Sequence, residues 1–308
     1  MTRAVVFAYH NVGVRCLRVL LAHGIDVPLV VTHEDAPGET IWFASVAATA
    51  GECSIPAIVP EDPITAELAA RGRALEPDFL FSFYYRKMLK APLLEAPSRG
   101  ALNMHGSLLP RYRGRAPVNW AVLNGERETG ATLHYMTVKP DAGDIAAQTA
   151  VPILPDDTAR EVFDKVTVAA EIALDRVLPA LMAGTAPRTR QDASASSYFG
   201  GRRPEDGLID WRRDATAIHD LVRAVAPPYP GAFTTVGGVP ARVLRTRRGD
   251  PAAAATPTPT LRLRDGRLVA RCGGGGELHV LALELAGSAA DAGTVRARFG
   301  DAPVALGA

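Results

Sequence analysis

Cysteine is scarce in this chain of 308 residues, which contains only Cys16, Cys53 and Cys272. The three lie far apart and form none of the closely spaced pairs that bind zinc or carry out thiol–disulfide exchange. We therefore expect them to act as small buried hydrophobic residues. A sparse, odd number of cysteines is typical of proteins from a reducing compartment, so we expect a cytoplasmic protein.

The sequence also lacks a strong excess of either charge and lacks long apolar segments. The formal net charge is +1, and from residue 205 to the C-terminus there are 13 arginines against 11 acidic residues. Such a weak excess argues against nucleic acid as the main partner. No apolar run approaches the ~20 residues of a membrane span, and residues 4–8 resemble a strand rather than a signal peptide. We expect neither a membrane nor a nucleic-acid partner.

Hydrophobic residues make up 47% of the sequence, which is enough for a sizeable core. Through the first two hundred residues, short apolar runs alternate with segments of helical spacing. This alternation predicts an α/β fold with a parallel sheet and right-handed crossovers, in which a ligand lies beyond the carboxyl ends of the strands. The predicted strands are residues 4–8, 28–32, 55–59, 78–83 and 100–104, and the predicted helices are residues 14–23, 41–51 and 64–75.

After Pro204 the pattern changes to short segments separated by glycine and proline, which predicts a small β-barrel or sheet domain. We therefore place one domain at residues 1–204 and a second at residues 205–308. Residues 250–260, with their Ala and Thr-Pro repeats, are interpreted as a loop. Within the second domain we predict one helix at 217–225 and strands at 208–211, 231–236, 241–245, 260–263, 267–271 and 278–285.

Weaker patterns in the sequence could also carry chemistry. The first strand leads into Tyr9-His10-Asn11-Val12-Gly13, which has one glycine instead of the three of a dinucleotide-binding fingerprint. His10 and Asn11 either line a pocket at the end of that strand or only cap the local backbone. The glycine run 273–276 is interpreted as a hairpin turn, because no Lys-Ser/Thr follows it.

No histidine spacing indicates a metal site, and we predict none. The histidines without ligand-like spacing are His23, His33, His134, His219 and His279. Arg202, Arg203 and Arg223 suit phosphate recognition or a solvated surface equally well.

The most informative residues for chemistry are Asn103 and His105. They lie two positions apart at the end of a predicted strand, so period-two geometry places both side chains on one face. Gly106 and Pro110 then interrupt the strand and leave the pair at its carboxyl end. A histidine that titrates near neutrality can both accept and donate a proton, and an asparagine amide can donate a hydrogen bond to an oxyanion.

An acid, Asp141, follows in the loop Lys139-Pro140-Asp141-Ala142-Gly143-Asp144. A carboxylate beside a histidine stabilises the charged imidazolium and raises its pKa. An amide, a histidine and a carboxylate together suit acyl transfer to an amine, which requires no serine or cysteine nucleophile. We expect Asn103, His105 and Asp141 to converge in one cleft.

The residues around His105 carry a family resemblance. The segment His-Gly-Ser-Leu-Leu-Pro-Arg-Tyr-Arg-Gly-Arg-Ala-Pro at 105–117 closely resembles the signature of the folate-dependent formyltransferases. That family includes methionyl-tRNA formyltransferase and sugar N-formyltransferases. Further resembling stretches are residues 5–10, 32–39, 81–86, 199–203, 223–226 and 230–233, so the likeness covers most of residues 1 to 245.

The resemblance implies a Rossmann-like domain followed by a barrel similar to an OB fold, and it implies roles for single residues. His105 would be the proton shuttle, Asn103 would stabilise the transition state, and Asp141 would raise the pKa of His105. The cosubstrate would be 10-formyltetrahydrofolate. The residues implied to contact it are Lys87, Met88, Leu89, Arg115, Thr137, Val138, Lys139, Pro140 and Asp141.

The stretches that flank the signature resemble one branch of the family, whose members formylate UDP-4-amino-4-deoxy-L-arabinose during lipid A modification. In that branch the formyltransferase is half of a bifunctional enzyme, and we expect another protein to supply the decarboxylating step of the other half. The alternatives are a dTDP-amino-sugar N-formyltransferase, methionyl-tRNA formyltransferase and, outside enzymes, a folate-binding relic. The oligomeric state stays open.

Overall fold

The structure, a computed structural model, describes residues 1–38, 40–61 and 66–307. Glu39 and Ile64, which fall within segments discussed above, lie outside the described residues. The chain folds into two compact units, and each is described by itself. The first unit comprises Met1–Pro117, Glu128–Pro152 and Phe163–Gly200, and the second comprises Val118–Arg127, Ile153–Val162 and Gly201–Ala308.

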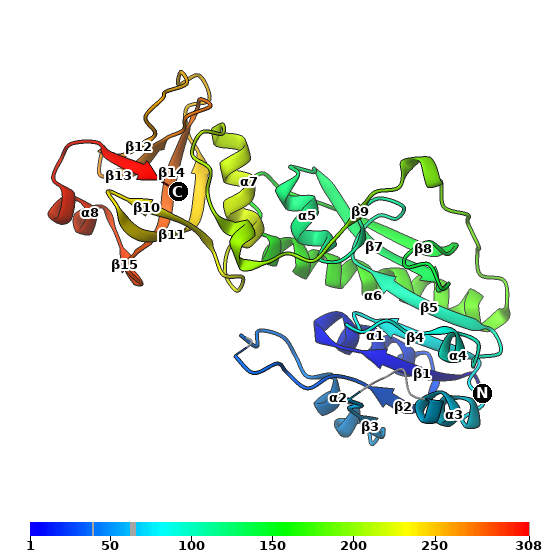
Figure 1. Ribbon diagram of the computed structural model, residues 1–308. Coiled ribbons are helices and arrows are strands. Elements are labelled where there is room, and N and C mark those ends of the chain that lie inside the picture. Colours follow the sequence, from blue (N-terminus) through cyan, green and yellow to red (C-terminus); the bar gives the residue numbers. More distant parts are fainter. Residues whose placement is uncertain (39, 62–65, 308) are drawn as a thin grey trace. The chain divides into compact units, whose positions relative to one another are not determined.

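A mixed seven-stranded sheet forms the centre of the first unit, with strand order β3-β2-β1-β4-β5-β7-β8 (Figure 1). The strands from β3 to β5 are parallel, which confirms the predicted α/β class, and β7 and β8 add an antiparallel edge. The apolar runs of the sequence become these strands because both faces of the sheet are covered. The strands are β1 (Arg3–Ala8), β2 (Asp26–Val31), β3 (Ala57–Ile58), β4 (Phe79–Phe83), β5 (Gly100–His105), β7 (Glu128–Tyr135) and β8 (Ile145–Pro152). The short strands β6 (Arg113–Gly114) and β9 (Tyr198–Phe199) pair with each other.

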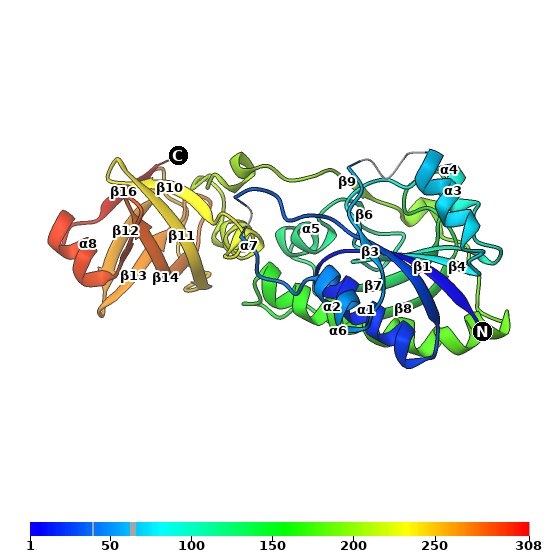
Figure 2. The same cartoon turned by 90° about the horizontal axis from the view of Figure 1, so that it is seen from below.

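Helices cover both faces of this sheet (Figure 2). One face packs against α3 and α4 through a cluster that includes Val5, Phe7 and Leu80, and α1 and α6 lie on the other face. Two predicted helices differ in their bounds: α1 begins at His10, before the predicted residue 14, and α2 begins only at Val46, where Ser45 caps it by accepting a bond from Ala48 N. The helices of the first unit are α1 (His10–Ala22), α2 (Val46–Glu52), α3 (Ala66–Ala74), α4 (Ala91–Leu94) and most of α6 (Ala159–Ala183), with a 3-10 turn at Ala193–Ala195. Nearly all of α5 (Pro117–Leu123) belongs to the second unit.

The second unit is built on a closed ring of six strands, β11-β10-β16-β12-β13-β14, which closes through pairing of β11 with β14. This confirms the predicted barrel. Its interior is filled by small and branched apolar side chains such as Val243, Leu261 and Leu278. The elements are α7 (Ala215–Val225), β10 (Ala232–Val236), β11 (Val239–Arg248), β12 (Thr260–Arg264), β13 (Arg267–Arg271), β14 (Glu277–Leu285), β15 (Ser288–Ala290), α8 (Ala292–Phe299) and β16 (Val304–Gly307), with a 3-10 turn at Pro204–Gly207.

Two expectations are corrected by the structure. The predicted strand at 208–211 is wrong: only Leu208 forms an isolated bridge, because Ile209 N bonds to Phe233 O while Trp211 O accepts from Gly273 N in a different segment. Because the backbone of this segment bonds to two different parts of the chain, it cannot continue the hydrogen-bond ladder of a single β-strand. The cysteine expectation holds for Cys16 and Cys272, which are buried, but Cys53 is exposed. It follows the last residue of α2, where the chain turns at the surface.

The glycine run forms the turn between β13 and β14, as predicted. Among the helices of the described residues, none is both long and apolar enough to cross a membrane.

Candidate active site

Asn103, His105 and Asp141 converge at the carboxyl end of β5. His105 Nδ1 lies 3.6 Å from Asp141 Oδ1. A fourth residue, His134 on β7, joins them: its Nε2 lies 3.5 Å from Asp141 Oδ1 and 3.2 Å from Asn103 Nδ2. The antiparallel register explains this, because Asn103 stands directly opposite His134. The pairing of β5 with β7 therefore brings the acid of the following loop to the predicted pair.

Burial and charge set the protonation of the two central groups. Burial lowers the pKa of His105 below its ordinary value; the Asp141 carboxylate pulls this pKa upward, but burial outweighs it. Burial also acts to raise the pKa of Asp141, yet His105, the nearby His134 and the backbone N–H of Gly114 together hold that pKa well below its usual range. At neutral pH the site therefore contains a neutral imidazole beside an ionised carboxylate.

The ring of His105 is held in one orientation. Its Nε2 lies 2.8 Å from the carbonyl oxygen of Tyr112, and a carbonyl only accepts, so Nε2 carries the hydrogen. In the neutral ring Nδ1 is then the basic nitrogen, and it faces Asp141. Gly106 follows immediately, and a Cβ there would lie 1.9 Å from Tyr84 Oη, so any other residue would displace the Tyr84 side chain.

The loop that carries Asp141 is fixed by buried side chains. The Asp141 carboxylate accepts a bond of 2.9 Å from Gly114 N. Gln191 Nε2 donates to the carbonyls of Asp141, at 2.9 Å, and Gly143, at 2.6 Å. Arg113 in turn donates to Gln191 Oε1 from Nε and Nη2, at 3.2 and 2.7 Å. Arg113 and Gln191 are each 8% exposed, so these bonds form away from water.

Sequence reasoning missed these supporting residues. Arg113 and Gly114 lie within the signature segment, which was a usable signal. His134 was considered only as a metal ligand. Gln191 lies 50 positions after Asp141 in a segment without regular structure, and no pattern pointed to it.

The residues implied to contact formylfolate fall into two groups. Thr137, Val138, Lys139 and Pro140 form the turn before Asp141, where Thr137 Oγ1 donates to Lys139 O and the Val138 side chain is 77% exposed. Lys87, Met88 and Leu89 follow β4, the neighbour of β5. Met88 is 55% exposed, whereas Leu89 is buried in the apolar cluster, so only its backbone can meet a ligand. Arg115 is exposed, and its N–H donates to Phe199 O.

Aromatic and charged side chains gather where β1, β2 and β4 end. Tyr9 Oη donates to Asp35 at 2.6 Å, and the guanidinium of Arg86 lies over the Tyr9 ring. His33 stacks on Tyr85 with ring centroids 4.0 Å apart and accepts a bond from Arg86 N at 3.0 Å. Burial, with Lys87 and Arg86 nearby, lowers the pKa of His33 to about 4, so this imidazole is neutral at physiological pH.

His10 and Asn11, which sequence reasoning left between a pocket and a capping role, both hold neighbouring segments. The His10 ring packs against Phe43 and Phe163, with centroids 3.9 and 4.6 Å away. Asn11 Oδ1 accepts from Ala44 N at 2.8 Å. Arg223 also has a structural role, because it is buried and paired with Asp220 at 2.8 Å. Within the described residues no group of three His, Cys, Asp or Glu has the arrangement of a metal site.

A neutral imidazole, an ionised carboxylate and an amide donor meet beyond the end of a sheet, and such a set of groups is able to carry out general acid–base chemistry. Comparison with models of protein families identifies the class of this protein more closely. The model of the formyl transferase family matches residues 19–178, and that of the formyl transferase C-terminal domain matches residues 202–294. The chain belongs to the formyl transferase family.

Several solved structures have a similar fold. The N-formyltransferase from Helicobacter canadensis, in complex with folinic acid and dTDP-3-aminofucose, has a TM-score of 0.71 at 20% identity and covers 91% of this chain and 99% of its own. WlaRD, a sugar 3N-formyl transferase solved with dTDP and 5-N-formyl-THF, has a TM-score of 0.70 at 19% identity over 91% and 97%. HypX from Aquifex aeolicus, in complex with tetrahydrofolic acid, has a TM-score of 0.62 at 17% identity over 96% and 47%.

Proposed function

We propose that this formyltransferase moves the formyl group of 10-formyltetrahydrofolate to the amine of a nucleotide-linked amino sugar. The convergence of Asn103, His105 and Asp141 carries the proposal. The amine attacks the formyl carbon and a C–N bond forms, while the Asn103 amide donates to the oxyanion of the tetrahedral intermediate. The bond from that carbon to N10 of the folate then breaks, and tetrahydrofolate leaves.

The proton moves through His105. The lowered pKa keeps its Nδ1 free to accept the proton that the attacking amine loses. The resulting imidazolium lies 3.6 Å from Asp141, whose carboxylate stays ionised and stabilises the new charge. His105 then returns the proton to N10 of the leaving folate. No proton is gained or lost over the cycle.

For the cosubstrate, support comes from the ligands of the similar structures: folinic acid, 5-N-formyl-THF and tetrahydrofolic acid. We assign the folate contacts to residues 87–89, Arg115 and residues 137–141. Met88 and Val138 belong to these segments, and both expose large apolar side chains that a folate ring system could cover.

For the acceptor, we propose UDP-4-amino-4-deoxy-L-arabinose, on the resemblance of the flanking stretches to that branch. The aromatic rings and the arginine at the ends of β1, β2 and β4 supply stacking surfaces and a positive charge for a nucleotide. A dTDP-linked amino sugar is a second candidate, because two of the similar structures were solved with dTDP ligands. A charged tRNA fits less well with a barrel domain that has 13 arginines against 11 acidic residues. A cytoplasmic location forms part of this proposal.

A competition assay tests the acceptor. UDP-4-amino-4-deoxy-L-arabinose, a dTDP-amino sugar and charged initiator tRNA are each supplied with 10-formyltetrahydrofolate, and kcat/KM for the formamide product is compared. We expect the UDP sugar to give the highest value. A higher value for the dTDP sugar or the tRNA would replace the acceptor but keep the formyl-transfer chemistry. Absence of turnover with every amine would reject the whole proposal.

A further inference from the structure

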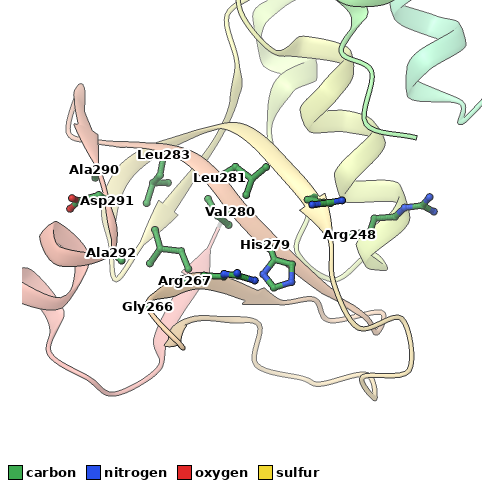
Figure 3. A pocket seen from close by; sticks show the side chains of 12 residues that line it. Arg248, Gly266, Arg267, His279, Val280, Leu281, Leu283, Ala290, Asp291 and Ala292 are labelled. Atoms are coloured by element: carbon green, nitrogen blue, oxygen red, sulfur yellow. The ribbon is translucent and has the colours of Figure 1, made fainter. Parts of the chain in front are cut away.

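A hollow of about 540 Å³ lies on the barrel of the second unit, and its lining contains no residue assigned above to formyl transfer (Figure 3). It is lined by the end of β11, the β12–β13 turn, β13 and β14, and the start of α8. Its volume lies in the range of small-molecule sites, which is roughly 300–1,000 Å³. The polar side chains of its lining are Arg247, Arg248, Arg267, His279 and Asp291.

The charge of this hollow is positive and poorly compensated. Within the part of the chain that the structure describes, no ion pair involves Arg248 or Arg267, and Arg247 reaches only Asp156, at 3.8 Å. Asp291 is the single acidic residue of the lining. Its Oδ1 accepts from Thr294 N and Oγ1, both at 2.8 Å, so this carboxylate is occupied in capping α8.

Other arginines of the barrel contrast with these. Arg242 pairs with Glu284, and Arg296 pairs with Asp301 at 2.8 Å. Arg264 reaches the buried Glu277 at 2.7 Å. These three arginines are neutralised by acidic residues, whereas Arg248 and Arg267 leave a cationic group at the hollow, which an anionic ligand would compensate.

His279 supplies a second, independent observation. It stands opposite Arg247 on β11, and the Arg267 side chain extends toward its ring (Figure 3). Its Nδ1 is buried and has no hydrogen-bond partner among the described residues. A buried polar atom without a partner is costly, at about 1–3 kcal/mol. Because the atom is shielded, a turn of the ring must present Nδ1 to a ligand, and the new bond would then remove that cost.

An apolar surface adjoins the cations. Leu281 lines the hollow and is 58% exposed, although it belongs to a strand whose other apolar residues are mostly buried. Ala290, which pairs with Leu283, and Ala292 add small apolar side chains to the lining. A ligand with a phosphate at the arginines would therefore meet a surface suited to a ring or a sugar.

We propose that this hollow binds a nucleoside phosphate, with its phosphates on Arg248 and Arg267, a phosphate oxygen or hydroxyl at His279, and its ring against Leu281. Arginine binds phosphate through two parallel N–H bonds, which fits two arginines without carboxylate partners. The limited volume favours a single nucleotide over a long nucleic acid. This site does not depend on the proposed function, since none of its residues belongs to the active site.

The test uses the full chain and isothermal titration with UDP and with inorganic pyrophosphate. Arg248→Ala combined with Arg267→Ala should weaken binding of both probes at this site at least tenfold, and Leu281→Ala should weaken UDP but not pyrophosphate. Two matched controls, Arg242→Ala and Arg296→Ala, remove the same charge outside the hollow and should bind as the wild type does.

The number of UDP sites separates this proposal from the proposed function. If both hold, UDP occupies two sites per chain, and the double variant retains one together with normal formyl transfer. If UDP binds only at the hollow, the number of UDP sites falls from one in the wild type to zero in the double variant. Equal binding by the double variant and the wild type, or equal losses in the controls, would overturn the proposal. Tighter binding of a 12-nucleotide RNA than of UDP, lost in the double variant, would replace the nucleotide with a nucleic acid.

Discussion

Gln191 offers a sharp test of how the carboxylate of the site is held. Its side chain makes four hydrogen bonds: two donated to the carbonyls of Asp141 and Gly143, and two accepted from Arg113. Gln191→Leu keeps roughly the same volume and removes all four. We expect the Asp141 loop to lose its fixed position and the buried Arg113 guanidinium to lose its acceptor.

The magnitude follows from these bonds. A neutral hydrogen bond contributes a net ~0.5–1.5 kcal/mol and one to a charged group ~1.5–3 kcal/mol. The two bonds to the carbonyls are neutral, and the bidentate contact with Arg113 involves a charged group. Together they predict a loss of about 3–5 kcal/mol in the free energy of unfolding. A displacement of about 1 Å at the site would lower kcat by roughly 10²-fold. The KM for formylfolate should rise as well, because the displaced loop carries residues 137–141, which belong to the proposed folate contacts.

A second substitution separates stability from positioning. Gln191→Glu keeps an oxygen for Arg113 but cannot donate to the carbonyls of Asp141 and Gly143. We expect it to recover only the part of the stability that comes from the contact with Arg113, and to remain low in kcat. Urea denaturation measures the first effect and steady-state kinetics the second. A Gln191→Leu enzyme with wild-type kcat, or a Gln191→Glu enzyme with full activity, would refute the positioning role.

Two further predictions concern the acid–base pair. His105→Ala should lower kcat by about 10²–10⁴-fold while formylfolate affinity, measured by equilibrium binding, stays close to that of the wild type; near-normal turnover would place the proton shuttle elsewhere. Because burial holds the pKa of His105 below 6.5, activity should be lost only below that pH. The Asp141→Asn substitution removes the charge that raises this pKa. It should therefore shift the acidic limb of the pH profile of kcat/KM to still lower pH. An acidic limb that moves upward in Asp141→Asn would contradict the assignment.

The lowered pKa of His105 also affects the free energy of unfolding. The unfolded chain protonates His105 near pH 6.5, whereas the folded protein resists protonation until a lower pH. Between these two pKa values the unfolded state binds more protons, so the contribution of His105 to stability rises with pH and is complete above 6.5.

The sequence predicted much of the first unit because its parallel strands are continuous apolar runs, as at residues 4–8 and 78–83. No element was predicted between residues 117 and 183, although α5, β7, β8 and α6 lie there. Strand β7 mixes Thr, Gly and His with apolar residues and is buried along nearly its whole length, so neither a period of two nor an apolar run marks it. Its residues become buried because they are paired and hydrogen-bonded between β5 and β8.

The candidate site was predictable to a different degree for each residue. Asn103 and His105 share a face through local strand geometry, which spacing alone reveals. The approach of Asp141 depends on the pairing of β5 with β7, and this is a property of the folded sheet. Gln191 joins the site only through tertiary hydrogen bonds, and such bonds leave no periodic trace in a sequence.

The residues of the signature segment chiefly determine the conformation of a loop. Ser107 is fully buried, and its Oγ donates to Arg111 O at 2.7 Å while its carbonyl accepts from Thr132 Oγ1 at 2.6 Å. Thr132 Oγ1 also accepts from Leu109 N and from Gln148 Nε2, at 3.2 and 2.8 Å. These bonds tie the loop after β5 to β7 and β8.

That loop presents the Tyr112 carbonyl to His105 Nε2 and so fixes which nitrogen is basic. A change at Ser107 should therefore act on the orientation of the imidazole before it acts on any substrate. The residues of the signature segment thus maintain the geometry that keeps Nδ1 of His105 directed at Asp141.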